Sequence, residues 1–311
     1  MDNLVTTNNV LFKASPVLKW AGGKTRLLPQ LRARYPEQLQ QGKINTYIEP
    51  FVGGGAVFFD LINNFSLEKA YLFDINTELI VLYQVIQKDV DYLIEELSIL
   101  SDNYLILNSD KRKKFYYKYR DRYNCFDKKI DTSLYQKEWS KRAALTIFLN
   151  RTCFNGLYRV NKAGAFNVPM GKYKNPRILN IDNLKAVNKV LQIARIQQAD
   201  FSKVLKYADC HTFIYYDPPY KPISKTASFN SYSSDTFDDS EQKRLRETFK
   251  LASEQGVLQM LSNSDPSNYK EDSFFDDLYR EFNIQRISAS RAINSKGNSR
   301  GEIKEILITN Y

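Results

Sequence analysis

Residues 45–55, NTYIEPFVGGG, run from a short apolar strand into three glycines. A helix over 56–64 and a second strand over 69–75, in which Asp74 marks the strand end, complete the predicted order of strand, glycine turn, helix and strand. That order is a βαβ unit, in which a crossover helix joins two parallel strands. The sequence therefore predicts an α/β protein with a parallel sheet.

Apolar periodicity and turn signals mark the remaining elements of the chain. We expect helices over 77–100, most of 101–149, 182–194 and 240–255, and strands over 212–216, 257–262, 283–289 and 303–309. The last two strands flank a polar Gly/Ser/Asn loop and are expected to form a hairpin, whereas 150–180 is expected to be largely loop. The pattern predicts one α/β sheet that is interrupted by a helical insert.

Composition excludes several classes of protein. Of the 311 residues, 43% are hydrophobic and 14% aromatic, which suffices for a core. Mean hydropathy is −0.48 and no apolar run approaches 18 residues, so we expect no membrane-spanning helix. Three cysteines without CxxC spacing and a single histidine argue against a disulfide scaffold, a zinc site and a Ser-His nucleophile pair. Residues 1–16 lack the pattern of a secretory signal, and we expect a cytoplasmic protein.

Positive charge is concentrated in one part of the chain. The formal net charge is +10, and residues 101–180 contain 18 Lys/Arg against 6 Asp/Glu, so this stretch holds the whole surplus. Aromatic residues such as Tyr116, Tyr158 and Tyr173 are interleaved with the cations. Cations beside aromatics that can stack on bases favour nucleic acid as the partner. A solvated helical face with its aromatics in the core is the alternative.

The glycines at 53–55 lie where ligand-binding turns occur in α/β proteins. Glycine permits a tight turn and a close approach of the backbone to a ligand. Asp74, at the end of the next strand, is placed to accept hydrogen bonds from ribose hydroxyls. The cluster is not GxGxxG, so another adenosine ligand is favoured over a dinucleotide. A plain tight turn with a solvent-facing Asp74 is the structural alternative.

A second glycine motif, KWAGGKT at 19–25, ends like a phosphate-binding P-loop. A P-loop requires glycine at position 18, which is Leu18, and no long buried strand is predicted before it. We therefore reject a P-loop. The remaining interpretations are a turn that contacts a ligand and a simple turn into the helix after Lys24.

The strongest chemical signal is DPPY at 217–220, after a continuous apolar strand. Ligand sites of α/β sheets lie at the carboxyl ends of strands. Pro218 and Pro219 fix the backbone and remove two donors, so that Asp217 and the Pro218 carbonyl can accept both hydrogens of an exocyclic amine. Tyr220 can stack on the attached ring. The motif predicts a site for a flat ring that carries an amine, and a strand-ending turn is the alternative.

Five motifs, in this order, resemble those of one enzyme family: KWAGGK at 19–24, EPFVGGG at 49–55, NGLYR at 155–159, FNVP at 166–169 and DPPY at 217–220. They match the Dam-type DNA adenine-N6 methyltransferases, and the resemblance spans roughly residues 17–310. The likeness is greatest to members that methylate GATC, including those of DpnII/MboI-like restriction–modification systems. The resemblance implies a Rossmann-like S-adenosylmethionine-dependent methyltransferase sheet with a helical and looped DNA-recognition insert.

The resemblance also implies roles for residues around the sheet. The implied S-adenosylmethionine contacts are Trp20, Lys24, Phe51, Gly53, Gly55, Asp74 and Asp217. Asp74 is expected at the ribose, and Asp217 between the cofactor and the target base. The implied catalytic set is Asp217, Pro218, Pro219 and Tyr220, without a metal. The adenine nitrogen is then expected to attack the sulfonium methyl group directly, so that catalysis rests on positioning and hydrogen bonds.

A DNA-recognition set is implied in and beside the insert: Lys19, Arg151, Phe154, Asn155, Leu157, Arg159, Pro169 and Tyr173. Arg159, the arginine of NGLxR, is expected to read a guanine edge, which agrees with the usual pairing of arginine and guanine. Phe154 is expected to insert into the base stack, and the leucine and proline of the set to make apolar contacts with bases. Cys153 and Met170 match no family pattern.

The implied domains are a catalytic domain of residues 1–80 and 183–311 and a target-recognition insert of residues 81–182. The implied substrate is double-stranded DNA whose target adenine leaves the stack, because N6 is unreachable inside a duplex. A restriction endonuclease encoded nearby is the expected functional partner, and a role in replication or repair is the alternative. Methylation of cytosine N4 or RNA adenine, and a non-catalytic DNA-binding relative, are the competing functions.

Overall fold

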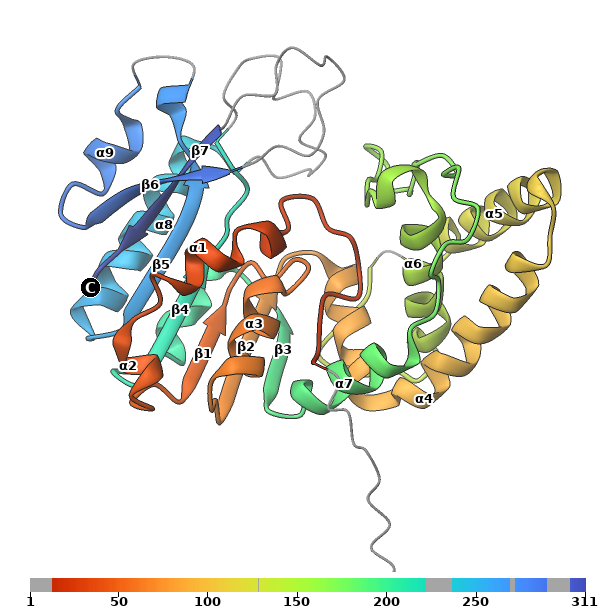
Figure 1. Cartoon of the computed structure of the whole chain (residues 1–311), viewed down its shortest axis with the longest axis horizontal. Coiled ribbons are helices and arrows are strands. Elements are labelled where there is room, and N and C mark those ends of the chain that lie inside the picture. The colour runs from red at the N-terminus through yellow and green to blue at the C-terminus, as the bar shows by residue number, and fades with distance from the viewer. Residues whose placement is uncertain (1–12, 128, 222–236, 269–271, 290–302) are drawn as a thin grey trace, which may run out of the picture.

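The computed structural model describes residues 13–127, 129–221, 237–268, 272–289 and 303–311. Its centre is a sheet in the strand order β3-β2-β1-β4-β5-β7-β6 (Figure 1). The strands are β1 (Thr46–Glu49), β2 (Lys69–Asp74), β3 (Ala194–Gln198), β4 (Thr212–Tyr216), β5 (Leu258–Ser264), β6 (Asn283–Ala289) and β7 (Ile303–Thr309). The pairs from β3 to β5 are parallel, and β7 runs antiparallel to both of its neighbours, β5 and β6. The predicted α/β fold is confirmed.

Helices cover both faces of this sheet and build the insert beside it (Figure 1). The α-helices are α1 (Leu28–Arg32), α2 (Glu37–Gln40), α3 (Ala56–Asn64), α4 (Thr77–Leu105), α5 (Ser109–Asn124), α6 (Trp139–Thr152), α7 (Ile181–Leu191), α8 (Asp239–Glu254) and α9 (Phe274–Leu278). The 3₁₀ turns are η1 (Lys24–Arg26), η2 (Phe154–Gly156), η3 (Phe201–Lys206) and η5 (Pro266–Asn268). No helix among the described residues is both long and apolar enough to cross a membrane.

Alternate residues of the strands enter two separate cores, as the period of a strand requires. Tyr47 and Phe213 belong to the core under α1, α3, α4 and α7, whereas Ile48 and Ile214, one residue further along each strand, belong to the core under α8, α9 and η3. All four side chains are fully buried. Because the sheet is buried on both faces, its only wide access for a ligand is along the strand ends.

The predicted βαβ unit is present as β1, α3 and β2, and α3 spans the residues that the sequence analysis assigned to it. Strand β3 was missed: the predicted helix over 182–194 ends at Leu191, and β3 begins at Ala194. This strand lies at the sheet edge and pairs with β2 alone, so its outward side chains are polar and its apolar signal is short. The predicted pairing of the last two strands is confirmed, and the polar loop between them lies outside the described residues.

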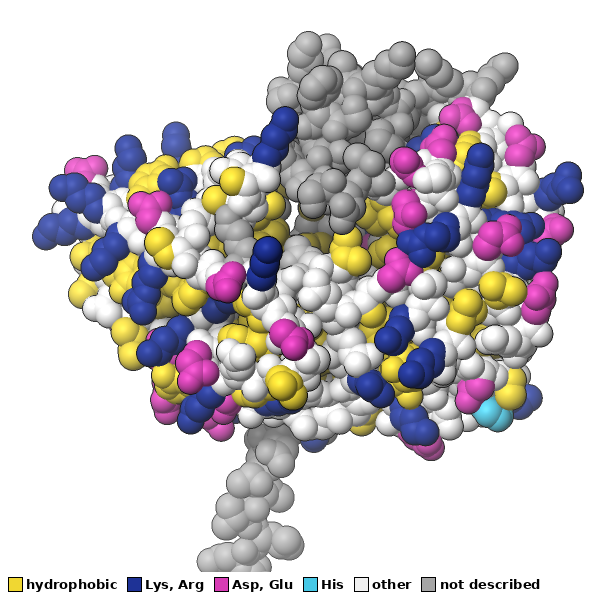
Figure 2. Space-filling model, turned by 180° about the vertical axis from the view of Figure 1, so that it is seen from behind, with side chains coloured by type: hydrophobic (Ala, Val, Ile, Leu, Met, Phe, Trp, Pro, Cys, Tyr) yellow, Lys and Arg dark blue, Asp and Glu magenta, His cyan; other side chains and the backbone are white. Residues whose placement is uncertain are grey.

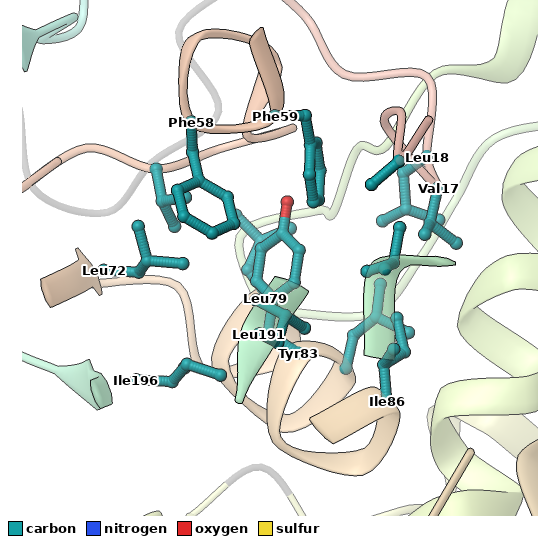
Figure 3. Close-up of a cluster of buried hydrophobic side chains, with 14 of the residues drawn as sticks. Val17, Leu18, Phe58, Phe59, Leu72, Leu79, Tyr83, Ile86, Leu191 and Ile196 are labelled. Carbon is teal, nitrogen blue, oxygen red and sulfur yellow. The ribbon is translucent and has the colours of Figure 1, made fainter. Parts of the chain in front are cut away.

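Helix α4 belongs to both parts of the molecule. Figure 3 shows Leu79, Tyr83 and Ile86 among buried side chains from α3, β2, β3, α7 and the segment before η1. Asp89 then breaks the helix with a φ of −142° and a ψ of 41°. The part of α4 before Asp89 thus packs on the sheet, and the part after it runs into the insert. The predicted boundary between residues 80 and 81 falls inside the first part.

The insert consists of the end of α4, helices α5 and α6, and the loop from 153 to 180, and it stands beside the sheet (Figure 1). The predicted helical stretch 101–149 is interrupted between α5 and α6. Arg142 of α6 forms a buried pair with Glu78 at the start of α4, with Nε 2.8 Å from Oε2. One hydrophobic core runs from the sheet into the insert through α4 and α6, so the two parts share packing.

Candidate active site and recognition surface

A cleft of about 990 Å³ opens at the carboxyl ends of β1, β2 and β4. Its walls are the turn at 20–24, the glycine turn at 51–55, Asp74 and residues 217–220. The fold thus brings together every residue that the sequence analysis assigned to the cofactor or to catalysis. They come from distant parts of the chain and meet because parallel strands end at one edge of the sheet.

The glycine turn after β1 requires glycine for two reasons. Gly53 and Gly55 have φ of +46° and +69°, in the left-handed region. A Cβ on Gly53 would lie 2.9 Å from the Trp20 ring, so the close approach of these two segments also requires the absence of a side chain. Asp74 fixes the turn, because its carboxylate accepts the Gly53 N–H at 3.0 Å and the Asn76 N–H at 2.9 Å.

Three parallel strands end in a carboxylate that lines the cleft: Glu49 ends β1, Asp74 ends β2 and Asp217 follows β4. Glu49 is buried and accepts the Tyr47 hydroxyl at 2.9 Å and the Phe58 N–H at 3.2 Å. Burial raises the pKa of Glu49 well above its usual range and raises the pKa of Asp74 to about 6. Sequence reasoning gave Glu49 no role, although its place at a strand end is the signal that marked the other two.

Lys24 is the cation at the centre of the cleft. Its side chain is buried, and its Nζ lies 2.7 Å from Asp217 Oδ1 and donates to the Gly22 carbonyl at 2.8 Å. The Ser262 hydroxyl donates to the same carboxylate oxygen at 3.3 Å. Burial raises the pKa of Asp217, and the charge of Lys24 opposes that rise. Within the described residues these contacts fall on Oδ1, so Oδ2 is the oxygen that can accept a hydrogen bond from a ligand.

The two prolines direct their carbonyl groups differently. The Pro219 carbonyl accepts a hydrogen bond from Gln242 Nε2 at 3.3 Å. No residue in the described ranges donates to the Pro218 carbonyl, whose role as a ligand acceptor stays a prediction. Tyr220 follows, with Lys24 Nζ 4.5 Å from the centroid of its ring. Acceptors and an aromatic ring therefore converge at one point of the cleft.

The far wall of the cleft holds residues that sequence reasoning missed. Phe51 lies 5.6 Å from the ring of Phe201 and 5.7 Å from that of Phe237, measured between centroids. Arg244 of α8 binds both carboxylate oxygens of Asp200 at 2.8 Å and holds the pKa of that carboxyl below its usual range. Asp200 and Phe201 lie at the start of η3, and Phe237 and Arg244 lie just before α8 and on it. No motif marks these residues, and only tertiary packing brings them to the cleft.

Trp20 connects the cleft to the insert. Its ring stacks on Tyr158 with a centroid distance of 5.1 Å and an interplanar angle of 26°. The preceding residue, Lys19, exchanges two hydrogen bonds of 2.9 Å with the side-chain amide of Asn150 on α6. Its Nζ lies 5.0 Å from the centroid of the Tyr173 ring. Two residues of the predicted recognition set, Lys19 and Tyr173, are therefore in contact.

The predicted recognition residues around η2 form an exposed loop. The side chain of Phe154 is 51% exposed, and its N–H donates to the Pro169 carbonyl at 2.8 Å. Asn155 has a φ of +56°, which is uncommon for a residue other than glycine and marks a sharply bent backbone. Cys153 and Met170, which match no family pattern, form an antiparallel bridge that joins the two halves of this loop.

The two arginines of the predicted set lie in different places. Arg159 Nε donates a hydrogen bond to Asn167 Oδ1 at 2.7 Å. These two residues stand next to a second antiparallel bridge of the loop, between Val160 and Phe166. Arg151 donates instead to the Val17 carbonyl and lines a separate cavity of about 240 Å³ together with Arg177. Burial lowers the pKa of Arg151, and the charge of Arg177 adds to the effect. Leu157, the remaining member, is half-buried against the core.

Comparison with known proteins agrees with this geometry. A family model for the D12 class of N6 adenine-specific DNA methyltransferases matches residues 20–293. The chain belongs to this family. The type II methyltransferase M.MjaIII of Methanocaldococcus jannaschii is 49% identical over 300 residues, which cover 96% of this chain and 100% of that relative. The type II methyltransferase M1.LlaDCHI of Lactococcus lactis is 39% identical, with 99% of each chain covered, and the DNA adenine methylase of Escherichia coli is 30% identical, with 93% of each covered.

The protein is therefore an adenine-specific DNA methyltransferase. The rejection of a P-loop is consistent with its fold, because Gly23 precedes the short turn η1 and the first described strand, β1, begins only at Thr46. The family resemblance drawn from the five motifs is confirmed. The target sequence of the protein and the role of each site residue stay predictions.

The surplus positive charge of the D12-class insert is most visible on α5. Lys111, Lys113, Lys114 and Lys118 are exposed, and none of them forms an ion pair with another described residue. Figure 2 shows dark blue side chains gathered over this helix, at the left edge of that view. Helix α5 lies on the side of the insert away from the sheet (Figure 1). The aromatic residue Tyr116 on the same helix is buried in the core, so here the structural interpretation of the aromatics holds.

Proposed function

We propose that the protein transfers a methyl group from S-adenosylmethionine to N6 of adenine in double-stranded DNA, within the sequence GATC. The observation that carries this proposal is the position of Asp217, Pro218 and Tyr220 at the end of β4, inside an acidic cleft beside the insert. An acceptor pair beside an aromatic ring suits an amine on a flat base, and the family fixes the base as adenine.

The charges of the cleft fit a cationic, phosphate-free adenosyl compound. Its lining includes the carboxylates of Glu49, Asp74 and Asp217, while Lys24 and Arg244, the two cations among its described lining residues, are held in ion pairs. The phosphates of a nucleotide would favour cations that are not already paired with carboxylates. S-adenosylmethionine carries a sulfonium and an ammonium group and no phosphate, and when bound it supplies the methyl group together with its positive charge.

Different residues of the cleft then bind different parts of the cofactor. Asp74 keeps acceptor capacity beside its hydrogen bonds to the Gly53 and Asn76 N–H groups, and it accepts hydrogen bonds from the ribose hydroxyls. The rings of Phe51 and Phe201 receive the adenine of the cofactor. Trp20 and Lys24, on the opposite side near Asp217, line the methionine part. Gly53 and Gly55 let the backbone pass close to the ligand without a side chain.

The target adenine is proposed to leave the duplex and enter between Asp217 and Tyr220, because its N6 is unreachable inside the stack. Asp217 Oδ2 and the Pro218 carbonyl each accept a hydrogen bond from one N–H of the N6 amine. These two bonds hold the amine at a fixed position and draw its lone pair out of conjugation with the adenine ring. Lys24 pairs with Asp217, and its charge opposes the rise in the Asp217 pKa that burial causes. Pro219 keeps the turn rigid, and the proposal requires no nucleophile on the enzyme and no metal.

The recognition loop is proposed to contact the bases of GATC. Arg159 reads a guanine edge, and its hydrogen bond to Asn167 sets the direction of the guanidinium. Phe154, half exposed at the loop tip, fills the space near the extruded base. The other members of the predicted set, Lys19, Arg151, Asn155, Leu157, Pro169 and Tyr173, are proposed to support or contact the DNA around them.

The proposal extends to organisation and partners. Residues 1–80 and 183–311 are proposed as the catalytic domain and 81–182 as the target-recognition insert, with α4 shared across the first boundary. A cytoplasmic location and a restriction endonuclease encoded nearby stay predictions. Sequencing of the genes next to this one would test the second of these directly.

Protection of plasmid DNA tests the proposed specificity. Plasmid treated with the protein and S-adenosylmethionine should resist a nuclease that is blocked by adenine methylation in GATC and remain sensitive to one that cuts GATC regardless of it. Mass spectrometry of the digested nucleosides should then find N6-methyldeoxyadenosine. N4-methylcytosine, methylation confined to RNA, or protection at sites other than GATC would contradict the proposal.

A further inference from the structure

Tyr220 is held at both its hydroxyl and its ring. The hydroxyl donates a hydrogen bond to Glu305 Oε2 at 2.6 Å, a short distance of the kind found with charged acceptors. Lys24 Nζ lies 4.5 Å from the centroid of the same ring. The aromatic ring of the proposed base-binding site is therefore fixed by a carboxylate at its edge and a cation near its ring.

Glu305 reaches this place from the far end of the chain. It lies on β7, which runs antiparallel between β5 and β6, and its partners in register are Ser264 and Ile287. Burial raises the pKa of Glu305, and Lys24 and the Tyr220 hydroxyl oppose that rise. No motif marks this residue, and neither the predicted site nor the proposed reaction has used it so far.

The ionisable side chains around Tyr220 alternate in sign. Asp217 is paired with Lys24 at 2.7 Å, and Lys24 lies beside the ring whose hydroxyl Glu305 holds. The staggered rotamers of a tyrosine side chain place its hydroxyl at different points, and only some of them bring it to a given acceptor. A carboxylate acceptor selects one of them.

We propose that Glu305 is a positioning residue for methyl transfer, which acts by holding the Tyr220 ring at the angle at which the target adenine stacks on it. This inference rests on the proposed function, since it concerns the base that Tyr220 receives. It assigns to β7 a direct part in the site: the antiparallel strand inserted next to β5 brings an acceptor that the parallel strands do not provide.

A purely structural role for Glu305 predicts different behaviour. A half-buried carboxylate needs a hydrogen-bond donor. In a purely structural role, the Tyr220 hydroxyl would serve as that donor and stabilise Glu305, and Glu305 would not position the Tyr220 ring. In that case Tyr220→Phe should lower stability and leave the rate of methyl transfer unchanged. If Glu305 acts through Tyr220, its removal should slow the reaction in wild type and have no further effect once the hydroxyl is absent.

A double-mutant cycle on the full chain separates these cases. We expect Tyr220→Phe and Glu305→Ala each to reduce the single-turnover rate on an unmethylated duplex about tenfold, the size of one missing charge-assisted hydrogen bond. The double variant should be no more than about twofold slower than either, and Glu305→Gln, which keeps an acceptor oxygen, should recover most of the rate. The dissociation constant of S-adenosylmethionine, measured by calorimetry, should change less than about twofold.

Fluorescence of 2-aminopurine at the target position supplies a readout of stacking. Because stacking on tyrosine quenches this base, both single variants should give a brighter complex than wild type. Tyr279→Phe is the matched control for the hydroxyl, since Tyr279 is buried and its hydroxyl has no partner among the described residues. Glu254→Gln, on the exposed face of α8, is the matched control for the charge.

Each outcome is decisive. Losses that multiply in the double variant, or single variants with the rate and fluorescence of wild type, would overturn the inference. Wild-type protein that methylates no DNA adenine would overturn the proposed function instead, and the two failures are distinguished by the wild-type rate alone. Thermal melting of all variants shows whether a rate loss reflects unfolding.

Discussion

The carboxyl end of the sheet and the recognition loop of the insert hold their functional residues in opposite ways. In the cleft, Lys24 is buried and paired with Asp217, and Asp74 accepts hydrogen bonds from two backbone N–H groups. In the insert, Phe154 is half exposed, and the α5 lysines have no ion-pair partner among the described residues. The first region is fixed before any ligand arrives, and the second presents groups for a partner to pair.

This difference follows from what each region has to recognise. A methyl transfer depends on fixed distances between a few atoms, which favours residues locked by burial and mutual hydrogen bonds. DNA recognition combines base contacts, which need directed groups and for which we propose Arg159, with phosphate contacts, which need only exposed charge. Substitutions in the cleft should therefore affect the rate on every substrate alike, whereas substitutions in the loop should affect the choice between substrates.

The largest effect is expected from Asp217→Ala. Methyl transfer should fall by roughly 10³-fold or more on every DNA sequence, because the acceptor that orients the amine is removed. The change should also cost roughly 3 kcal/mol of unfolding free energy, because it leaves the buried Lys24 without its carboxylate. Methyl incorporation and thermal denaturation measure the two effects separately.

The double variant Asp217→Ala/Lys24→Met is the control for this experiment. It should regain most of the missing stability, since no buried charge remains unpaired, and it should stay inactive. Turnover equal to wild type in Asp217→Ala would contradict the proposed mechanism, and so would activity restored together with stability.

A smaller effect is expected from Asp74, and it should depend on pH. Asp74→Ala should weaken S-adenosylmethionine binding by roughly 1–3 kcal/mol, the usual cost of removing a hydrogen bond to a charged group. Because burial raises the pKa of Asp74 to about 6, the carboxyl becomes protonated as pH falls through that value, and the affinity of wild type should fall with it. Calorimetry between pH 5 and 8 measures both effects.

In Asp74→Asn the side chain no longer titrates, so the affinity should be lower but should not depend on pH in this range. An affinity for the cofactor that Asp74→Ala leaves unchanged would make Asp74 a turn residue only, with its hydrogen bond to Gly53 as its whole role.

Arg159→Ala should change selectivity more than rate. Removing a guanine contact worth about 1–3 kcal/mol should lower methylation of GATC and hardly affect duplexes already altered at that base pair, so that the ratio between them narrows. Asn167→Ala should have a weaker effect in the same direction, because it leaves Arg159 in place and removes the group that directs it. A fall by one common factor on cognate and altered duplexes would instead make Arg159 a phosphate or structural residue.

The smallest effect is expected from single lysines of α5. Replacing Lys111, Lys113 or Lys114 by alanine should weaken binding to all sequences about equally. It should also lower the slope of log affinity against log salt by about one for each phosphate that the variant no longer neutralises. Binding measured at several salt concentrations tests each variant. Because α5 lies on the side of the insert away from the sheet, a lysine that changes GATC selectivity would contradict the division between the two regions.

The cleft was largely predictable from the sequence because its residues stand where apolar strands end. The run before Asp217 and the strand before the glycine turn are buried, and the position of their ends follows from the chain itself. Glu49 carried the same signal and was overlooked. Asp200 and Arg244 were not predictable in this way, since they reach the cleft only through the packing of η3 and α8.

The insert was predictable in a different sense. Its charge and helical content were visible in the sequence, but the direction of each side chain was not. Arg151 donates to the Val17 carbonyl, and Asn155 adopts a left-handed backbone conformation, and both depend on contacts between segments far apart in the chain. Strand β3 was missed for a related reason, because an edge strand buries only one side and its pattern resembles the end of a helix.

The position of the methyl group in a pool of duplexes tests the central claim most directly. Wild type, Asp217→Asn and Arg159→Ala are each incubated with S-adenosylmethionine and duplexes that carry four randomised base pairs, and the methylated base and its sequence are read from the product. We predict N6-methyladenine in GATC for wild type, almost no product for folded Asp217→Asn, and N6-methyladenine in a wider set of sequences for Arg159→Ala. A methyl group on another base, or an Arg159→Ala product with the wild-type sequence distribution and only a lower yield, would contradict it.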